Sequence, residues 1–154
     1  MPFSDLLSPG GALGRVRVPS KRALFQLLAD RGAALTGHRA DAIGDAMAER
    51  ERLGVTGFGG GIAIPHGRLT GLARPVGLLA ILDPAVDYDA LDGAPVDLAF
   101  LLLTAVEDGA GHLKTLARVS RALRDRALVA KLRGAASADA LWAVAATGPL
   151  PAAA

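Results

Sequence analysis

The stretch that decides the fold is Pro95-Val96-Asp97-Leu98-Ala99-Phe100-Leu101-Leu102-Leu103. Apart from Asp97, it is apolar at the positions that would face both sides of a strand. A second apolar run of strand length precedes it, Pro75-Val76-Gly77-Leu78-Leu79-Ala80-Ile81-Leu82. Strands that are apolar on both faces lie at the centre of a sheet with helices over each side. These two runs therefore predict the middle of an α/β domain.

Shorter patterns place the remaining elements around these strands. Arg15–Val18 alternates like a short strand. Another short strand is expected near Val86–Tyr88, between the turn signals Asp83-Pro84 and Asp92-Gly93. Capping residues and apolar spacing predict helices from Ser20 to before Gly32, about His38–Leu53, about His112–Leu123, Asp125–Leu132 and from Ser137 onward.

The predicted fold is a single α/β domain over residues 1–148. Its sheet is expected to be mixed, mainly parallel and of about five strands, with helices on both faces. No internal repeat or Pro/Ser-rich linker divides the chain. Residues 149–154, Pro-Leu-Pro-Ala-Ala-Ala, are expected to be a frayed tail.

Composition excludes several classes of protein. Hydrophobic residues make up 51% of the 154 residues and charged residues 21%, as in ordinary globular domains. The net charge is only +2, and no basic run is interleaved with aromatic residues, which argues against a nucleic-acid partner. The longest apolar run, Leu98–Leu103, is too short to cross a bilayer, and Met1–Asp5 does not begin a secretory signal. We therefore expect a cytoplasmic protein without membrane insertion.

Metal and cofactor chemistry have little support. The absence of cysteine excludes thiolate metal sites and cysteine nucleophiles. His38, His66 and His112 are too scattered for the close pairing of a zinc site. The glycine-rich segment lacks the third glycine of a dinucleotide fingerprint and the Gly-Lys-Ser/Thr ending of a phosphate-binding P-loop. No metal and no cofactor are expected.

The segment with the clearest functional character is Gly54-Val-Thr-Gly-Phe-Gly-Gly-Gly-Ile-Ala-Ile-Pro-His66-Gly67. Glycines let a backbone approach a ligand closely, and successive free N–H groups form a concavity suited to an anion. Gly57, Gly59, Gly61 and Gly67 are the predicted phosphate-loop residues. Pro65 stiffens the backbone that presents His66. An imidazole beside an anion-binding loop suggests phosphoryl chemistry on the histidine itself.

Two further residues are candidates for the same site. Neutral imidazole is a good nitrogen nucleophile near pH 7, and phosphoryl transfer depends mainly on positioning and charge stabilisation. Arg50, late in the predicted helix before the loop, is expected to bind phosphoryl oxygens. His112, in the first turn of the next helix, is expected to stay neutral and to donate to phosphate or orient His66. The alternative is that Arg50 only complements a helix dipole and that His112 is only a helix-start residue.

These motifs resemble the IIA domains of the phosphoenolpyruvate-dependent phosphotransferase system, fructose/mannitol type (EIIA type 2). The resemblance rests on Gly57–Gly67, on Pro95-Val-Asp-Leu98, and on the segment His112-Leu-Lys-Thr-Leu-Ala-Arg-Val-Ser120. It implies a mixed sheet with helices on both faces, and His66 as an acceptor of phosphate from an HPr-type phosphocarrier. Arg50 and His112 match positions around the phosphohistidine. Gly60 departs from the family, many members of which carry Asn or Glu there.

The branch indicated is the nitrogen-regulatory one. Thr56–Gly59 and Leu116–Asp125 look most like the nitrogen-regulatory IIA proteins. The resemblance implies a nitrogen-branch phosphocarrier as donor, and control of partners such as kinases or transporters by the phosphorylation state of His66. One alternative is a sugar-specific IIA component that passes phosphate to a IIB protein. Another is a binding module that is not phosphorylated.

Overall fold

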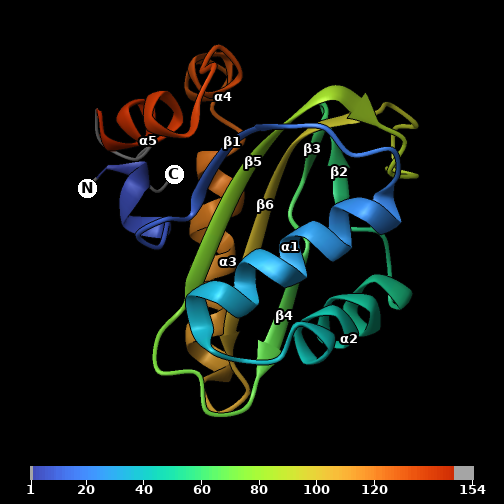
Figure 1. The fold of residues 1–154 in the computed structure, drawn as a ribbon, viewed down its shortest axis with the longest axis vertical. Helices are drawn as coiled ribbons and strands as arrows, with labels where there is room; N and C mark the ends of the chain where they lie inside the picture. The colour runs from blue at the N-terminus through green and yellow to red at the C-terminus, as the bar shows by residue number, and fades with distance from the viewer. Residues whose placement is uncertain (1, 148–154) are drawn as a thin grey trace.

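The computed structural model describes residues 2–147, which form a six-stranded sheet covered by helices on both faces (Figure 1). In chain order the elements are η1 (Phe3–Leu6), β1 (Ala12–Val16), α1 (Lys21–Thr36), α2 (Ala40–Arg52), β2 (Gly57–Gly59), β3 (Ile62–Ala63), β4 (His66–Leu69), β5 (Val76–Val86), β6 (Val96–Ala105), α3 (Gly109–Ala122), α4 (Arg126–Arg133) and α5 (Ala138–Ala146).

The two apolar runs are the central strands β5 and β6, which pair antiparallel with Leu79 opposite Phe100. The sheet order is β1-β5-β6-β3-β2, and β4 also pairs with β6. Three pairings are parallel, those of β1 with β5, β3 with β6 and β4 with β6. The predicted mixed, mainly parallel α/β fold is confirmed. It has six strands instead of about five because the glycine-rich segment itself forms strands.

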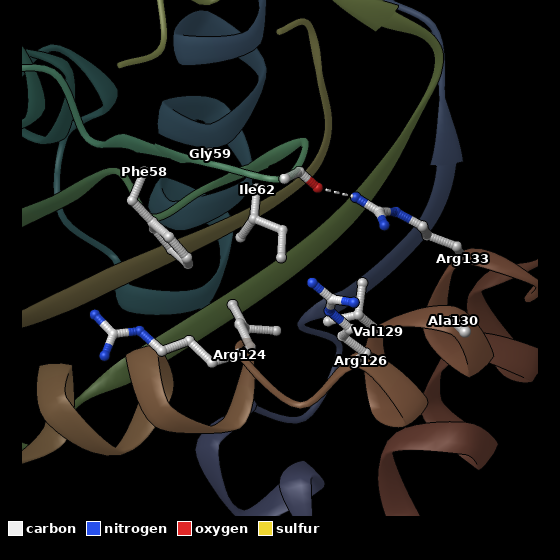
Figure 2. Close-up of a pocket in the computed structure, with 10 residues that line it drawn as sticks. Phe58, Gly59, Ile62, Arg124, Arg126, Val129, Ala130 and Arg133 are labelled. Atoms are coloured by element: carbon white, nitrogen blue, oxygen red, sulfur yellow. Dashed lines mark hydrogen bonds between the residues drawn. The ribbon is translucent and has the colours of Figure 1, made fainter. Parts of the chain in front are cut away.

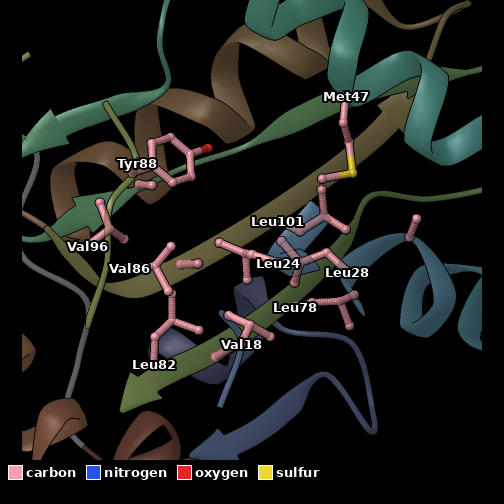
Figure 3. Packing of buried hydrophobic residues seen from close by; sticks show 14 of the residues in the cluster. Val18, Leu24, Leu28, Met47, Leu78, Leu82, Val86, Tyr88, Val96 and Leu101 are labelled. Carbon is pink, nitrogen blue, oxygen red and sulfur yellow. The ribbon is translucent and has the colours of Figure 1, made fainter. Parts of the chain in front are cut away.

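Successive residues of β6 enter two separate cores. Leu98, Phe100 and Leu102 belong to the cluster beneath α3, α4, α5 and η1. Ala99, Leu101 and Leu103 belong to the cluster beneath α1 and α2. In the second of these, Leu24 and Leu28 of α1 and Met47 of α2 pack towards Leu78 and Leu101 (Figure 3). Burial on both faces explains why the β6 sequence is continuously apolar.

The edge of β6 that carries the candidate site is shared by two short strands. Ile62 and Ala63 of β3 pair with Leu98 and Ala99, and β4 pairs further along, with His66 opposite Leu102. Between them, Ile64 and Pro65 leave the regular ladder, where a proline has no N–H to donate. β4 therefore begins at His66, and only its β6 side is paired within the described sheet.

Several predicted boundaries were wrong. The strand predicted at Arg15–Val18 is β1, which spans Ala12–Val16. The first helix does not stop before Gly32 but continues to Thr36, with Gly37 at φ +76° as its C-cap. Gly32 packs closely against α2, since a Cβ there would lie 3.2 Å from Ile43 Cδ1.

The separate strand near Val86–Tyr88 does not exist, and Asp83-Pro84 is not a turn between strands. β5 instead runs through both to Val86, which pairs with Val96 across a register shift that accommodates the proline. The turn at Asp92-Gly93 is confirmed by a hydrogen bond from Gly93 N–H to the Ala90 carbonyl. The tail predicted for residues 149–154 lies outside the described residues.

Candidate functional site

His66 stands at the start of β4 and is only 7% exposed. Its ring Nδ1 lies 2.8 Å from the carbonyl oxygen of Ile64. A carbonyl only accepts hydrogen bonds, so Nδ1 carries the proton and donates it. In the neutral ring, the lone pair is then on Nε2. The irregular backbone at Ile64–Pro65 thus selects which nitrogen is nucleophilic.

Arg50 binds that second nitrogen. It lies in the last turn of α2, and its Nε–H donates to His66 Nε2 over 3.1 Å. A second guanidinium nitrogen donates to the Gly54 carbonyl over 2.8 Å, which fixes the side chain to the end of its own helix. The predicted proximity of Arg50 and His66 is therefore present in the structure. A phosphoryl group on Nε2 would replace the hydrogen bond from Arg50 and would offer its oxygens to the same guanidinium.

His112 reaches the site from the opposite face of the sheet. It lies one turn into α3, whose N-cap is Asp108, and its ring centroid is 5.5 Å from that of His66. Its Nδ1 is 2.6 Å from the hydroxyl oxygen of Thr104 on β6. α3 packs along β6 and β4 pairs with β6, so this topology brings together two histidines 46 residues apart in sequence.

Both imidazoles are held towards the neutral form. Burial is the main reason that the pKa of His66 is lowered from its ordinary value of 6.5, and the Arg50 guanidinium lowers it further. The hydrogen bond to the Ile64 carbonyl acts in the opposite direction. Burial also lowers the pKa of His112, with smaller contributions from His66, Arg68 and Arg50. A neutral His66 is the form with a lone pair to give.

Arg68 is a site residue that the sequence analysis missed. Together with Glu49 and Leu53 it lines the pocket of about 260 Å³ that contains His66, Arg50 and His112. One of its terminal nitrogens donates to the Val106 carbonyl over 2.7 Å. Arg68 follows His66 by two positions on β4, and side chains two apart on a strand share a face. This spacing of two residues could have identified Arg68 from the sequence, but only if a strand had been predicted to begin at His66.

The glycines of the predicted phosphate loop lie in two different places in the structure. Gly57 and Gly59 are in β2, and Gly60 and Gly61, at φ +67° and +80°, form the turn to β3. Positive φ at both central residues is the geometry of a tight hairpin turn. None of these four lines the His66 pocket, and the Gly60 N–H already donates to Asp92.

Gly67 does line the pocket, and its role is close packing. A Cβ at Gly67 would lie 2.9 Å from the Ala46 Cβ and 3.2 Å from the Ala46 carbonyl carbon. Only a residue without a Cβ lets α2 sit so near β4, and α2 carries Arg50. The phosphate-loop function of Gly57, Gly59 and Gly61 remains a prediction that this arrangement does not favour.

Within residues 2–147, no group of three or more His, Asp or Glu side chains is arranged to hold a metal ion. Over the same residues, no helix is both long enough and apolar enough to span a membrane.

Fold and pocket define an α/β domain that holds a neutral histidine between an arginine and a second histidine. Residues 12–146 match the model of the family described as "Phosphoenolpyruvate-dependent sugar phosphotransferase system, EIIA 2". The chain belongs to this family.

Individual relatives point to one branch of it. The chain is 45% identical to a nitrogen regulatory protein of Bradyrhizobium diazoefficiens, over 99% of this chain and 100% of the relative. It is 43% identical to one of Pseudomonas aeruginosa, over 92% and 93% of the two chains. Its fold is similar to the crystal structure of nitrogen regulatory protein IIA-Ntr from Neisseria meningitidis, with a TM-score of 0.83, 28% identity, and 92% and 97% coverage.

Proposed function

We propose that this protein is a phosphoryl-relay regulator that accepts phosphate on His66 Nε2 and controls its partners through its phosphorylation state. The observation that carries the proposal is the pair of hydrogen bonds on the His66 ring. Nδ1–H donates to Ile64, and the Nε2 lone pair faces Arg50 inside the pocket. The ring is therefore oriented, neutral and placed beside a cation before any donor arrives.

The transfer itself is an exchange of one P–N bond for another. The Nε2 lone pair attacks phosphorus of a phosphohistidine on an HPr-type carrier, and the donor imidazole leaves with the electrons of its P–N bond. The ring of His66 becomes positively charged, and the Ile64 carbonyl, which accepts from Nδ1–H, stabilises that charge. Arg50 moves from Nε2 to the phosphoryl oxygens, and Arg68 and His112 line the same pocket.

Exposed apolar residues around the pocket suit a protein donor. Leu53 lines the pocket and is 80% exposed, and Leu113, next to His112, is 68% exposed. Large apolar side chains gathered at one place on a surface are typical of protein–protein contacts. Phosphorylation would add about −1.5 to −2 charges in the middle of this surface, which is enough to change partner binding. The nitrogen-branch relatives support a regulatory role over sugar transport.

The test is phosphoryl transfer from phosphoenolpyruvate through enzyme I and the cognate HPr-type carriers. We expect an acid-labile, base-stable phosphate on the wild type and none on His66→Ala. His38→Ala is the matched control, because His38 binds the Thr70 carbonyl and does not line the pocket. Phosphate on His66→Ala, or no transfer from any active cognate carrier, would overturn the proposal.

A second step separates regulation from sugar transport. Phosphorylated protein is mixed with sugar-specific IIB domains of the same organism, and the phosphate is followed. Retention of the phosphate on this protein is the expected result. Rapid transfer to a IIB domain would instead identify it as a sugar-specific IIA component.

A further inference from the structure

A second pocket lies between the β2–β3 hairpin and the helices α3 and α4 (Figure 2). Its volume is about 490 Å³, within the range of about 300–1,000 Å³ that small-molecule sites occupy. It shares no lining residue with the His66 pocket. His112 and Leu123 lie at opposite ends of α3, about 16 Å apart at the helical rise of 1.5 Å per residue.

The interior of this second pocket is apolar. Ile62, Leu123 and Val129 line it and are nearly inaccessible to solvent, and Phe58 is partly buried at its side. In Figure 2, Phe58 and Ile62 project from the hairpin towards the helices. An apolar body of aromatic size would pack between the hairpin on one side and the helices on the other.

Apart from Ala130, the remaining lining side chains of this pocket are cationic. The Arg133 guanidinium is already hydrogen-bonded within the protein, since it donates to Asp97 and to the Gly60 carbonyl. Arg124 and Arg126 are exposed, and within residues 2–147 neither guanidinium group makes a hydrogen bond or an ion pair. No acidic side chain lines the pocket. Two uncompensated guanidinium groups at the rim of an apolar cavity are complementary to an anion with an apolar body.

The glycine turn has a function in this second pocket that it lacks at His66. Arg133 binds the Gly60 carbonyl, which ties the hairpin to α4 and closes one end of the cavity (Figure 2). A Cβ at Gly61 would lie 2.7 Å from that same guanidinium and 2.8 Å from Asp97. The bare backbone of the turn therefore permits the clamp that shapes the cavity.

We infer that the cavity between the hairpin and α4 binds a small amphipathic anion, an aromatic or aliphatic body carrying a carboxylate or a phosphate. The apolar body lies against Phe58, Ile62 and Val129, and the anionic group is held by Arg124 and Arg126. Binding there leaves the His66 pocket open, so an effector and a phosphocarrier can be bound together.

The probes are naphthyl phosphate, naphthoate and uncharged naphthol, titrated into the isotope-labelled protein and followed by NMR. We expect saturable shifts at Phe58 and Val129 with at least one of the two anions, and much weaker binding of naphthol. Whichever anion binds more tightly identifies the preferred anionic group. The double variant Arg124→Ala/Arg126→Ala should weaken anion binding about tenfold or more, since both charged donors to the anion are lost.

The matched control is Arg22→Ala/Lys131→Ala, which removes two exposed cations outside this cavity. It should bind the anions as the wild type does. Ala130→Glu, an exposed lining position on α4, adds a negative charge without disturbing the core and should also abolish binding. Absence of saturable binding, shifts centred on His66, or equal losses in both double variants would overturn the inference.

Discussion

His66 takes part in two hydrogen bonds of opposite sense, as donor through Nδ1 and as acceptor through Nε2. The Ile64 carbonyl sets the tautomer, while Arg50 holds the nitrogen that would be phosphorylated. The hydrogen bond from Arg50 to Nε2 must break before Nε2 attacks. Arg50 therefore orients the ring at rest and would afterwards bind the phosphoryl oxygens. Under the proposed function, the same guanidinium would therefore have one contact in the resting state, with Nε2, and another in the product, with the phosphoryl oxygens.

Replacement of Arg50 tests the second contact. Arg50→Ala should slow phosphoryl uptake about tenfold to a hundredfold, because a charged donor to the transferring group is lost. Arg50→Lys should recover only part of the rate, since an ammonium cannot hold both Gly54 and a phosphoryl oxygen in fixed geometry. Single-turnover transfer from the phosphocarrier measures both. Arg31→Ala is the control, because Arg31 is an exposed cation on α1 that does not line the pocket; an equal loss there would contradict the assignment.

Protonation of His66 provides a pH test. Burial lowers the pKa of His66 from 6.5, so its NMR titration midpoint should fall below that value. Between the folded pKa and an unfolded value of about 6.5, the unfolded chain binds more protons, and stability falls as pH decreases through that window. His66→Gln should reduce this slope in urea unfolding. A midpoint at or above 6.5, or an unchanged slope, would show that the ring is not held neutral.

At the scale of elements, the contact between α2 and β4 determines whether Arg50 reaches His66. α2 lies directly over β4 at Gly67, and it is anchored at its C-terminal end by a polar network. Glu51 accepts from Lys21 Nζ and from both the N–H and the hydroxyl of Thr56. The Thr56 hydroxyl is also 2.7 Å from the Tyr88 hydroxyl. Arg50 is thus the neighbour of Glu51, a residue fixed by three hydrogen bonds from Lys21 and Thr56.

Gly67→Ala should displace α2 from β4. The new Cβ would lie 2.9 Å from Ala46, so the helix must shift, at a cost of about 1–3 kcal/mol for overpacking. Phosphoryl uptake should also fall, because Arg50 moves with the helix. Urea unfolding and single-turnover transfer measure the two effects.

Gly44→Ala in the same helix is the contrasting control. A Cβ at Gly44 would meet only Ala29, at 3.9 Å, so the variant should gain about 0.5–1 kcal/mol from helix propensity. Similar behaviour of the two alanine variants would mean that the contact at Gly67 is not what positions α2.

The same elements show where prediction from sequence succeeded and where it could not. β5 and β6 were predictable because burial on both faces makes a strand continuously apolar. Ser20 and Ser137 were recognisable caps, and both side chains accept from the helix N-terminus. The strands β2 to β4 were missed because they have two to four residues each and are rich in glycine, so no period can be detected. Arg68 was missed with them.

At the scale of the whole molecule, the site depends on strand order, which local sequence does not specify. His66, Arg50 and His112 were recognised as residues of the right chemistry, but their proximity depends on β4 pairing with β6 between α2 and α3. For the glycine turn, by contrast, the local composition suggested a function that the fold assigns to a different place. Its composition predicted an anion-binding loop beside His66, whereas its hydrogen bonds with Asp92 and Arg133 place it in a hairpin at a different pocket.

The two cores share β5 and β6, so we expect the molecule to unfold as one cooperative unit. Leu101 is fully buried in the core under α1 and α2, whereas Trp142, the single tryptophan, packs against the opposite core. Leu101→Ala should cost about 2–5 kcal/mol. Because the strands connect both faces, Trp142 fluorescence and far-UV circular dichroism should report coincident urea transitions, shifted equally. If the fluorescence transition stays at its wild-type midpoint while the dichroism transition moves, the two faces unfold separately. Strain at α2 would then not be transmitted to α3, the helix that carries His112.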